Sequence, residues 1–169
     1  MTSEIRTAFR LATDYVIRLT NDIPADCECR QPTGVNNHPV WTLGHLCGSL
    51  QAMAGELGQD PWLPEEWVSL FETGTQPSDC PDDYPSLGAV RDAFVEAVRR
   101  LDDTLRNTSS AQLQRPLPDE SYRRTLPTVG HAAVHILVGH LSVHAGQLSV
   151  WRAAVGLERQ TEHFDRNSL

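Results

Sequence analysis

The sequence predicts an all-α protein, a four-helix bundle with long crossover connections. Apolar residues recur at intervals of three and four in four separate segments, which is the period of an amphipathic helix. The stretches between these segments are rich in proline, glycine and acidic residues, and no alternation of strand and helix patterns indicates a sheet. Four helices with two long connections are typical of a bundle with crossovers. A chain of 169 residues is expected to form one domain over residues 1–169.

Two helices are expected in the first third of the chain. The first covers residues 3–21 and the second residues 38–58. Asn37 or His38 can cap the second helix, because Pro39 suits the first turn that follows.

An irregular stretch and a third helix follow. Residues 59–85 break every periodicity, and a connection of this length is either functional or a crossover between distant helix ends. Its apolar residues indicate that it packs onto the protein: Trp62, Trp67, Leu70 and Phe71. The third helix is expected over residues 86–107, with Ser86 as its cap.

The last helix is the longest of the four. It follows a second irregular stretch, residues 107–126, which can hold a short hairpin or an extended crossover. The helix is expected over residues 127–156, with Gly156 as its stop. A polar tail, residues 157–169, remains, and its His163 is expected to face solvent.

The charge and cysteine content exclude several classes of protein. The formal net charge is −8 and every basic residue is an arginine, a composition unsuited to nucleic acid, anionic membranes or Schiff-base chemistry. No apolar run approaches the roughly 20 residues of a membrane span, and the N-terminal residues lack a signal-peptide core. We therefore expect a cytoplasmic protein with no nucleic-acid or membrane partner. Its cysteines are expected to be free thiols: Cys27, Cys29, Cys47 and Cys80.

Four histidines lie in "HAAVHILVGHLSVHAGQL", within the last predicted helix. At about 100° per residue, His131 and His135 point to one side of an ideal helix, and His140 and His144 point to the other. Most apolar neighbours share the side of the second pair, so we expect the first pair on a solvated or interface face. Two buried histidines one turn apart need a partner, and one divalent ion can serve both.

A third ligand is expected from the second helix. His45 lies well inside that helix, so His45, His140 and His144 form a candidate three-histidine metal site. His38 competes as the third ligand, but its place before Pro39 favours a role at the helix start. Three neutral imidazoles leave at least one position open, as in catalytic zinc sites.

Three further residues near this site have predicted roles. Gln147 shares the helix face of the histidine pair and Ser49 lies one turn after His45, so either side chain can orient a ligand ring. Arg152 could reach an anionic substrate, but we expect it to be solvated.

The stretches "HPVWTLGHLCGSLQAM" and "GHLSVHAGQLSVWRAAVG" resemble the two signature stretches of the DinB/YfiT-like superfamily of metalloenzymes. The connection "LPEEWVSLFETGTQP" also resembles one branch of it, so the resemblance runs from the first helix to Gly156. It implies a bundle of up-up-down-down connectivity that binds a divalent metal, usually zinc or nickel. The implied ligands are His45, His140 and His144, and homodimers are common among similar proteins.

The resemblance suggests thiol chemistry without choosing a reaction. Characterised relatives include S-transferases that use low-molecular-weight thiols such as bacillithiol or mycothiol, and a mycothiol-dependent isomerase. An open metal site could activate water for hydrolysis or bind a thiolate for transfer. We therefore expect a metal-dependent S-transferase or hydrolase that acts on a small molecule. The alternative is a non-catalytic metal-binding bundle that acts through dimerisation or ligand sensing.

Overall fold

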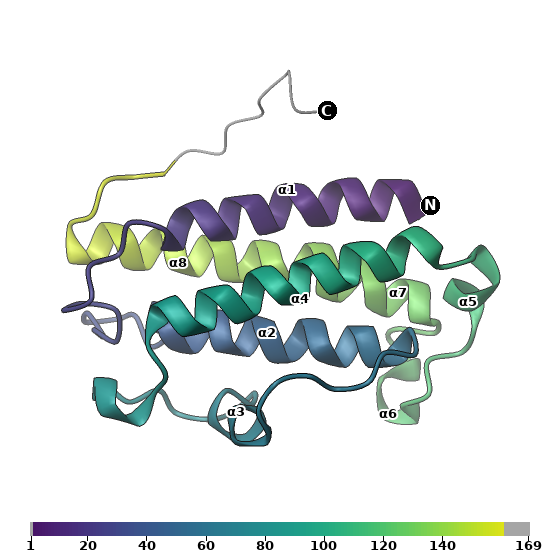
Figure 1. The fold of residues 1–169 in the computed structure, drawn as a ribbon, viewed down its shortest axis with the longest axis horizontal. Helices are drawn as coiled ribbons and strands as arrows, with labels where there is room; N and C mark the ends of the chain where they lie inside the picture. The colour runs from purple at the N-terminus through teal and green to yellow at the C-terminus, as the bar shows by residue number, and fades with distance from the viewer. Residues whose placement is uncertain (1, 161–169) are drawn as a thin grey trace.

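The computed structural model describes residues 2–160, and its main feature is four long helical segments (Figure 1). These segments are α1 (Thr2–Thr20), α2 (Pro39–Glu56), α4 (Leu87–Asn107), and a last segment formed by α7 (Val129–Val134), η2 (His135–His140) and α8 (Leu141–Val155). The described residues form no strand beyond an isolated bridge between Pro116 and Thr128. The all-α prediction is therefore confirmed, and each long helix begins and ends within about two residues of its expected bounds.

Short helices occupy the stretches that were expected to be irregular. α3 (Glu65–Leu70) and η1 (Pro81–Asp83) lie between α2 and α4, and α5 (Ser110–Gln114) and α6 (Glu120–Arg123) lie between α4 and α7. The first of these connections packs onto the bundle as predicted, because Phe71 is buried and Trp62, Trp67 and Leu70 are partly buried against the core. Backbone hydrogen bonds from Val129 to Arg115 and from Leu117 to Pro127 form an isolated antiparallel bridge in the second connection, which was expected to hold a short hairpin or an extended crossover.

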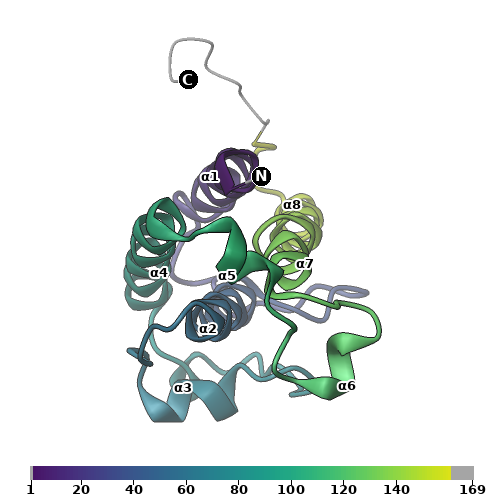
Figure 2. The same cartoon turned by 90° about the vertical axis from the view of Figure 1, so that its right-hand side faces the viewer.

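The four segments stand at the corners of a square when seen from the end (Figure 2). Around this square α1 neighbours α4, α4 neighbours α2, α2 neighbours the α7–α8 segment, and that segment neighbours α1. One fully buried side chain from each segment illustrates the shared core: Phe9, Leu43, Phe94 and Leu137.

The helix directions differ from the implied up-up-down-down order. α1 and the α7–α8 segment run one way, and α2 and α4 run the other, which gives an up-down-down-up order (Figure 1). Two side-chain contacts agree: Arg6 near the start of α1 bonds Asp102 near the end of α4, whereas Arg152 near the end of α8 bonds the Leu19 carbonyl near the end of α1. The expected order was wrong because only the connection after α2 has to run back along the bundle. The other two join antiparallel segments that lie diagonally across the bundle.

Two helices have the N-cap residues that were expected. His38 precedes α2, and its Nδ1 accepts a hydrogen bond from the Trp41 N–H at 3.2 Å. Ser86 precedes α4, and its Oγ accepts from the Ala89 N–H. His38 is fully buried, and this burial lowers its pKa to about 4. His38 therefore serves the start of α2 as a neutral side chain.

The last helical segment is not an ideal α-helix, because η2 is a π-helical turn. A π-turn has more residues per turn than an α-helix, so residues five apart lie closer together around the axis than they would in an α-helix. The rings of His135 and His140 consequently lie 6.3 Å apart between centroids. The expectation that His135 points away from His140 was therefore wrong. His131 and His135 are both exposed, as expected.

Arg152 was expected to be solvated, and this was also wrong. Only 1% of its surface is exposed. Its guanidinium pairs with the Asp22 carboxylate and donates to the backbone carbonyls of Leu19 and Glu158. A buried arginine is tolerated because these partners satisfy its charge and its N–H groups. Arg152 thus joins the ends of α1 and α8.

Other sequence predictions have mixed outcomes. All four cysteines are free thiols. None of the described helices has the length and apolar character needed to cross a membrane. His163 and the rest of the tail after Gln160 lie outside the described residues.

Candidate metal centre

His45, His140 and His144 converge between α2 and the α7–α8 segment. The Nε2 atom of His140 lies 3.1 Å from Nε2 of His45 and 3.1 Å from Nε2 of His144. Two nitrogens bound at about 2.0–2.1 Å to one tetrahedral zinc ion would be about 3.3 Å apart. The three ring nitrogens are therefore close enough together to share one ion. Within residues 2–160, this is the one group of three or more His, Cys, Asp or Glu side chains spaced in that way.

The backbone of the connection after α2 orients the His45 ring. Nδ1 of His45 donates a hydrogen bond to the carbonyl oxygen of Phe71 at 2.9 Å. A carbonyl can only accept, so the proton of the neutral ring sits on Nδ1 and Nε2 presents a lone pair to the cluster. The Trp41 ring stacks on the His45 ring with centroids 5.0 Å apart and planes only 4° from parallel. His45 is thus held in position and tautomer by its surroundings.

Burial keeps the other two rings neutral. It lowers the pKa of His140 to about 4, with further contributions from His144, His45 and His135. The pKa of His144 is also lowered to about 4, first by burial and then by His45. At neutral pH these nitrogens are therefore available to a metal without a proton to displace.

This donor set fits a divalent ion. The lone pairs of three imidazoles this close, with two of the Nε2 pairs at 3.1 Å, repel one another unless a cation or a shared proton lies between them. Nδ1 of His140 is buried and has no hydrogen-bond partner among the described residues, so the polar contacts of that ring are those of its Nε2 within the cluster. Imidazole is a preferred ligand of zinc and nickel.

A family model described as the DinB superfamily matches residues 8–148, which is most of the chain. This chain belongs to the DinB superfamily. A crystal structure of a protein from Streptococcus pneumoniae matches with a TM-score of 0.68 over 91% of each chain, at 14% sequence identity. That likeness shows a shared fold. No curated protein sequence matches the chain.

In this DinB bundle, the two residues predicted to orient the ligands differ in their contacts. The Ser49 hydroxyl donates to the backbone carbonyl of His45 at 3.0 Å, so it does not bond to the imidazole. Gln147 is exposed, and its side chain is close enough to His144 to oppose the lowering of that histidine's pKa. His131 stays apart from the cluster, with its Nδ1 2.8 Å from the Thr128 hydroxyl.

Sequence reasoning missed the two residues that hold His45, which are Trp41 and Phe71. The contact with Trp41 could have been predicted, because Trp41 precedes His45 by one helical turn. The contact with Phe71 could not have been predicted, because 26 residues separate it from His45 and only the folded connection brings them together. A weak clue lay in Gly44: a Cβ there would be 2.5 Å from the Phe71 ring, so glycine lets that ring rest on the helix.

Proposed function

We propose that this DinB protein is a metal-dependent enzyme in which His45, His140 and His144 hold one divalent ion, zinc or nickel. The observation that carries this proposal is the convergence of their three Nε2 atoms, two of the pairs at 3.1 Å. When bound, the ion supplies Lewis acidity, which favours the anionic form of a thiol or of water. The proposed reaction is accordingly thiol S-transfer to a small molecule, or hydrolysis of one.

The composition of the cluster supports a catalytic rather than a structural role. The group contains three imidazoles and no carboxylate or thiolate among the described residues. Structural zinc is normally closed by four protein ligands, whereas catalytic zinc keeps a position for water or substrate. Neutral ligands also leave the ion its full positive charge.

The surrounding residues would serve this chemistry by holding the ligands still. The Phe71 carbonyl keeps the proton of His45 on Nδ1, so Nε2 stays free to bind. The Trp41 ring stacks on one face of the same ring and restricts its rotation. Burial keeps His140 and His144 unprotonated through the neutral range.

Metal content tests the proposal. We expect about one zinc or nickel ion per chain in the purified protein, and a loss of at least fivefold in His140→Ala. His131→Ala is the matched control, because that exposed histidine lies on the same helical segment and outside the cluster. Equal metal in the wild type and in His140→Ala would overturn the assignment.

Activity assays separate the two reactions. The metal-loaded protein is mixed with a chromogenic electrophile and a panel of low-molecular-weight thiols, and in parallel with a chromogenic ester. A rate that needs both a thiol and the metal supports S-transfer. A metal-dependent rate with the ester alone supports hydrolysis.

The alternative is a metal-binding bundle that acts through dimerisation. Exposed Val134, Val143 and Val150 on the α7–α8 segment favour it, since exposed apolar side chains can form an interface. Light scattering of the wild type and Val143→Glu checks this alternative. A dimer that the substitution dissociates, together with no rate in either assay, would support it.

A further inference from the structure

A groove runs along α2 from the histidine cluster towards the end of the helix. It has a volume of about 430 Å³, and His45 forms part of its wall. One face of α2 makes its floor, and α3 with the chain on either side makes the opposite wall. Small-molecule sites typically fall between about 300 and 1,000 Å³. The groove therefore has room for part of a small molecule that reaches the cluster.

The outer wall of the groove is fastened to α2 at three points. Oε1 of Gln51 accepts hydrogen bonds from the N–H groups of Trp62 and Leu63, at 2.8 and 2.7 Å. Nδ1 of His45 donates to the Phe71 carbonyl, and farther along the chain Nε1 of Trp41 donates to the Thr75 hydroxyl at 2.9 Å. All three anchors come from α2. The wall is thus a built part of the fold.

The α2 face that forms the floor of the groove carries residues with small side chains or none. Gly48, Ala52 and Gly55 lie on the face of α2 that lines it. A Cβ added to Gly48 or Gly55 would meet no neighbouring atom within 4 Å, so close packing does not require glycine there. Neither glycine has a positive φ, and a mid-helix glycine costs about 1 kcal/mol relative to alanine. Their structural effect is the open space above the helix.

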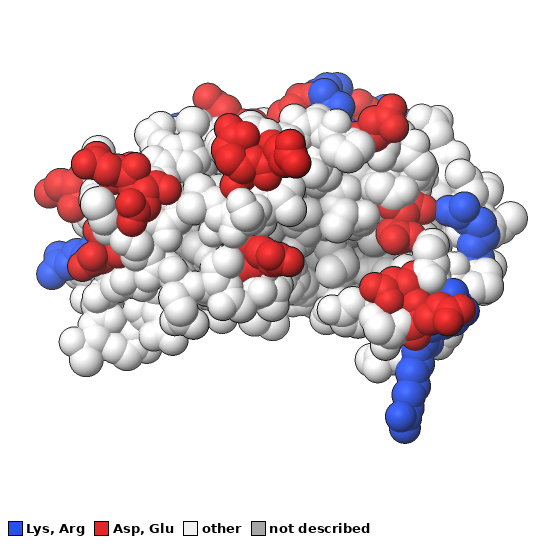
Figure 3. All heavy atoms as spheres, turned by 90° about the horizontal axis from the view of Figure 1, so that it is seen from below, with Lys and Arg blue, Asp and Glu red and all other residues white. Residues whose placement is uncertain are grey.

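The walls indicate what kind of group the groove accepts. Trp67, Phe71 and Leu63 contribute apolar surface, and Glu72 is the only charged side chain among the described residues that line it. The face of the molecule seen from below carries scattered acidic groups around uncharged surface (Figure 3). No lysine or arginine lines the groove. An anionic group in the part of the groove away from the histidine cluster would therefore be desolvated without a partner.

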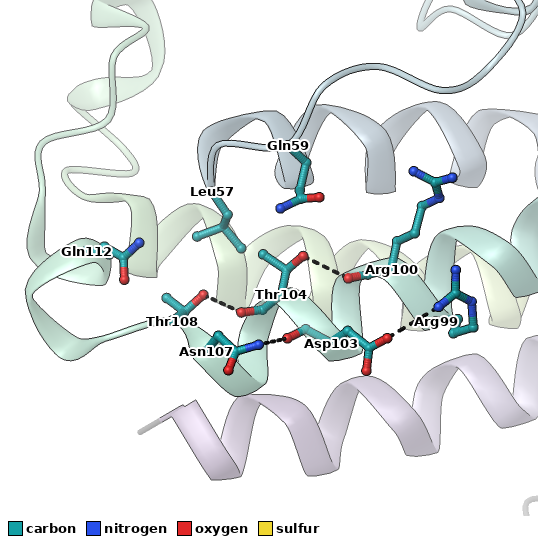
Figure 4. A pocket seen from close by; sticks show the side chains of 9 residues that line it. All are labelled: Leu57, Gln59, Arg99, Arg100, Asp103, Thr104, Asn107, Thr108 and Gln112. Atoms are coloured by element: carbon teal, nitrogen blue, oxygen red, sulfur yellow. Dashed lines mark hydrogen bonds and ion pairs between the residues drawn. The ribbon is translucent and has the colours of Figure 1, made fainter.

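A second hollow of similar volume lacks these features. It lies between the end of α2 and the second half of α4, and its polar groups bond one another or their own helix (Figure 4). Arg99 pairs with Glu96 and Asp103, and the Thr104 hydroxyl donates to the Arg100 carbonyl. It contains no residue of the histidine cluster.

We propose that the α2 groove binds an uncharged or cationic, apolar group of the substrate, about the size of one aromatic ring, and that it excludes anionic groups. The proposal rests on the proposed function in one respect, namely that the substrate reacts at the ion that His45, His140 and His144 would hold. Binding to the groove itself can be measured separately from the metal.

Three ligands with the same ring and different charge test the groove: benzyl alcohol, benzylamine and benzoate. Each is titrated into the full-length protein, as purified and after chelator treatment, while the backbone amide signals of Gly48 and Gly55 are followed by NMR. We expect saturable shifts at both glycines with benzyl alcohol and benzylamine, and binding at least tenfold weaker with benzoate.

The substitution Gly48→Leu should fill the space above the floor of the groove without disturbing the fold. Leucine is a better helix former than glycine, and nothing opposes its Cβ, so the variant should unfold at a temperature no lower than the wild type. We expect it to weaken benzyl alcohol binding at least tenfold. Gly88→Leu makes the same change on α4, outside the groove, and should leave binding within twofold of the wild type.

Three outcomes would overturn the proposal. They are undiminished benzyl alcohol binding in Gly48→Leu, shifts that occur only away from the groove, and benzoate that binds the chelator-treated protein as tightly as benzyl alcohol does. Metal analysis of the same samples reports on the proposed function independently. Wild-type metal in Gly48→Leu with loss of benzyl alcohol binding supports the groove, whereas equal metal in the wild type and in His140→Ala overturns only the metal assignment.

Discussion

The Nδ1 atom of His45 is hydrogen-bonded to the backbone carbonyl of Phe71 at 2.9 Å. This bond links His45, a candidate metal ligand in the middle of α2, to the connection between α2 and α4, which packs against the same helix. It fixes the tautomer of His45 and also anchors the wall of the groove. The candidate metal centre and the groove are therefore two parts of one local structure.

Gly44→Ala should disturb that bond without changing a ligand. The new Cβ would lie 2.5 Å from the Phe71 ring, so the ring and its carbonyl must move. We expect a tenfold or greater loss of zinc affinity in a chelator competition and a loss of about 1–3 kcal/mol in the free energy of unfolding. Gly55→Ala is the control on the same helix, because its Cβ meets nothing within 4 Å. Equal zinc affinity in the two variants would show that the Phe71 contact does not position His45.

Ser49→Ala should leave zinc affinity within about twofold of the wild type. The Ser49 hydroxyl bonds to the backbone carbonyl of His45 and not to the ring, so its removal leaves the imidazole in place. The same chelator competition measures this. A tenfold loss would mean that Ser49 contacts the ring or the ion in the metal-bound protein.

The metal-free protein should lose stability as the pH falls from about 6.5 to about 4. The pKa values of His38, His140 and His144 are each lowered by burial to about 4 in the folded chain. Below the ordinary histidine pKa of about 6.5, the unfolded chain takes up protons that the folded chain does not. Urea unfolding at pH 7, 6 and 5 gives the free energy, which should decline at each step. A constant value over this range would contradict the lowered pKa values.

Arg152→Ala should destabilise the protein without removing the candidate metal. The substitution leaves the Leu19 and Glu158 carbonyls without their donor and creates a cavity between α1 and α8. We expect a loss of about 2–4 kcal/mol in urea unfolding. Arg99→Ala removes an exposed pair with Glu96, which water screens, so it should destabilise the protein far less. Similar losses in both variants would argue against a structural role for the buried arginine.

Local sequence determined the helices and their ends. Apolar residues at three-and-four spacing mark all four long segments, and Ser86 and His38 cap the helices that they were expected to cap. These features depend on residues a few positions apart, so periodicity and capping chemistry are sufficient to predict them. The grouping of His45 with His140 and His144 was also predictable. An apolar helix face that carries histidines must turn towards the core, where the other helices lie.

Only the tertiary structure decided the surroundings of those histidines. The π-turn that brings His135 beside His140 has no signature in a helix wheel, because a wheel assumes a constant angle per residue. The helix directions, the burial of Arg152 and the bond from His45 to Phe71 each depend on segments far apart in the chain. Such contacts form when the connections fold back onto the helices. Sequence periodicity describes which face a helix buries, and the folded connections decide what that face meets.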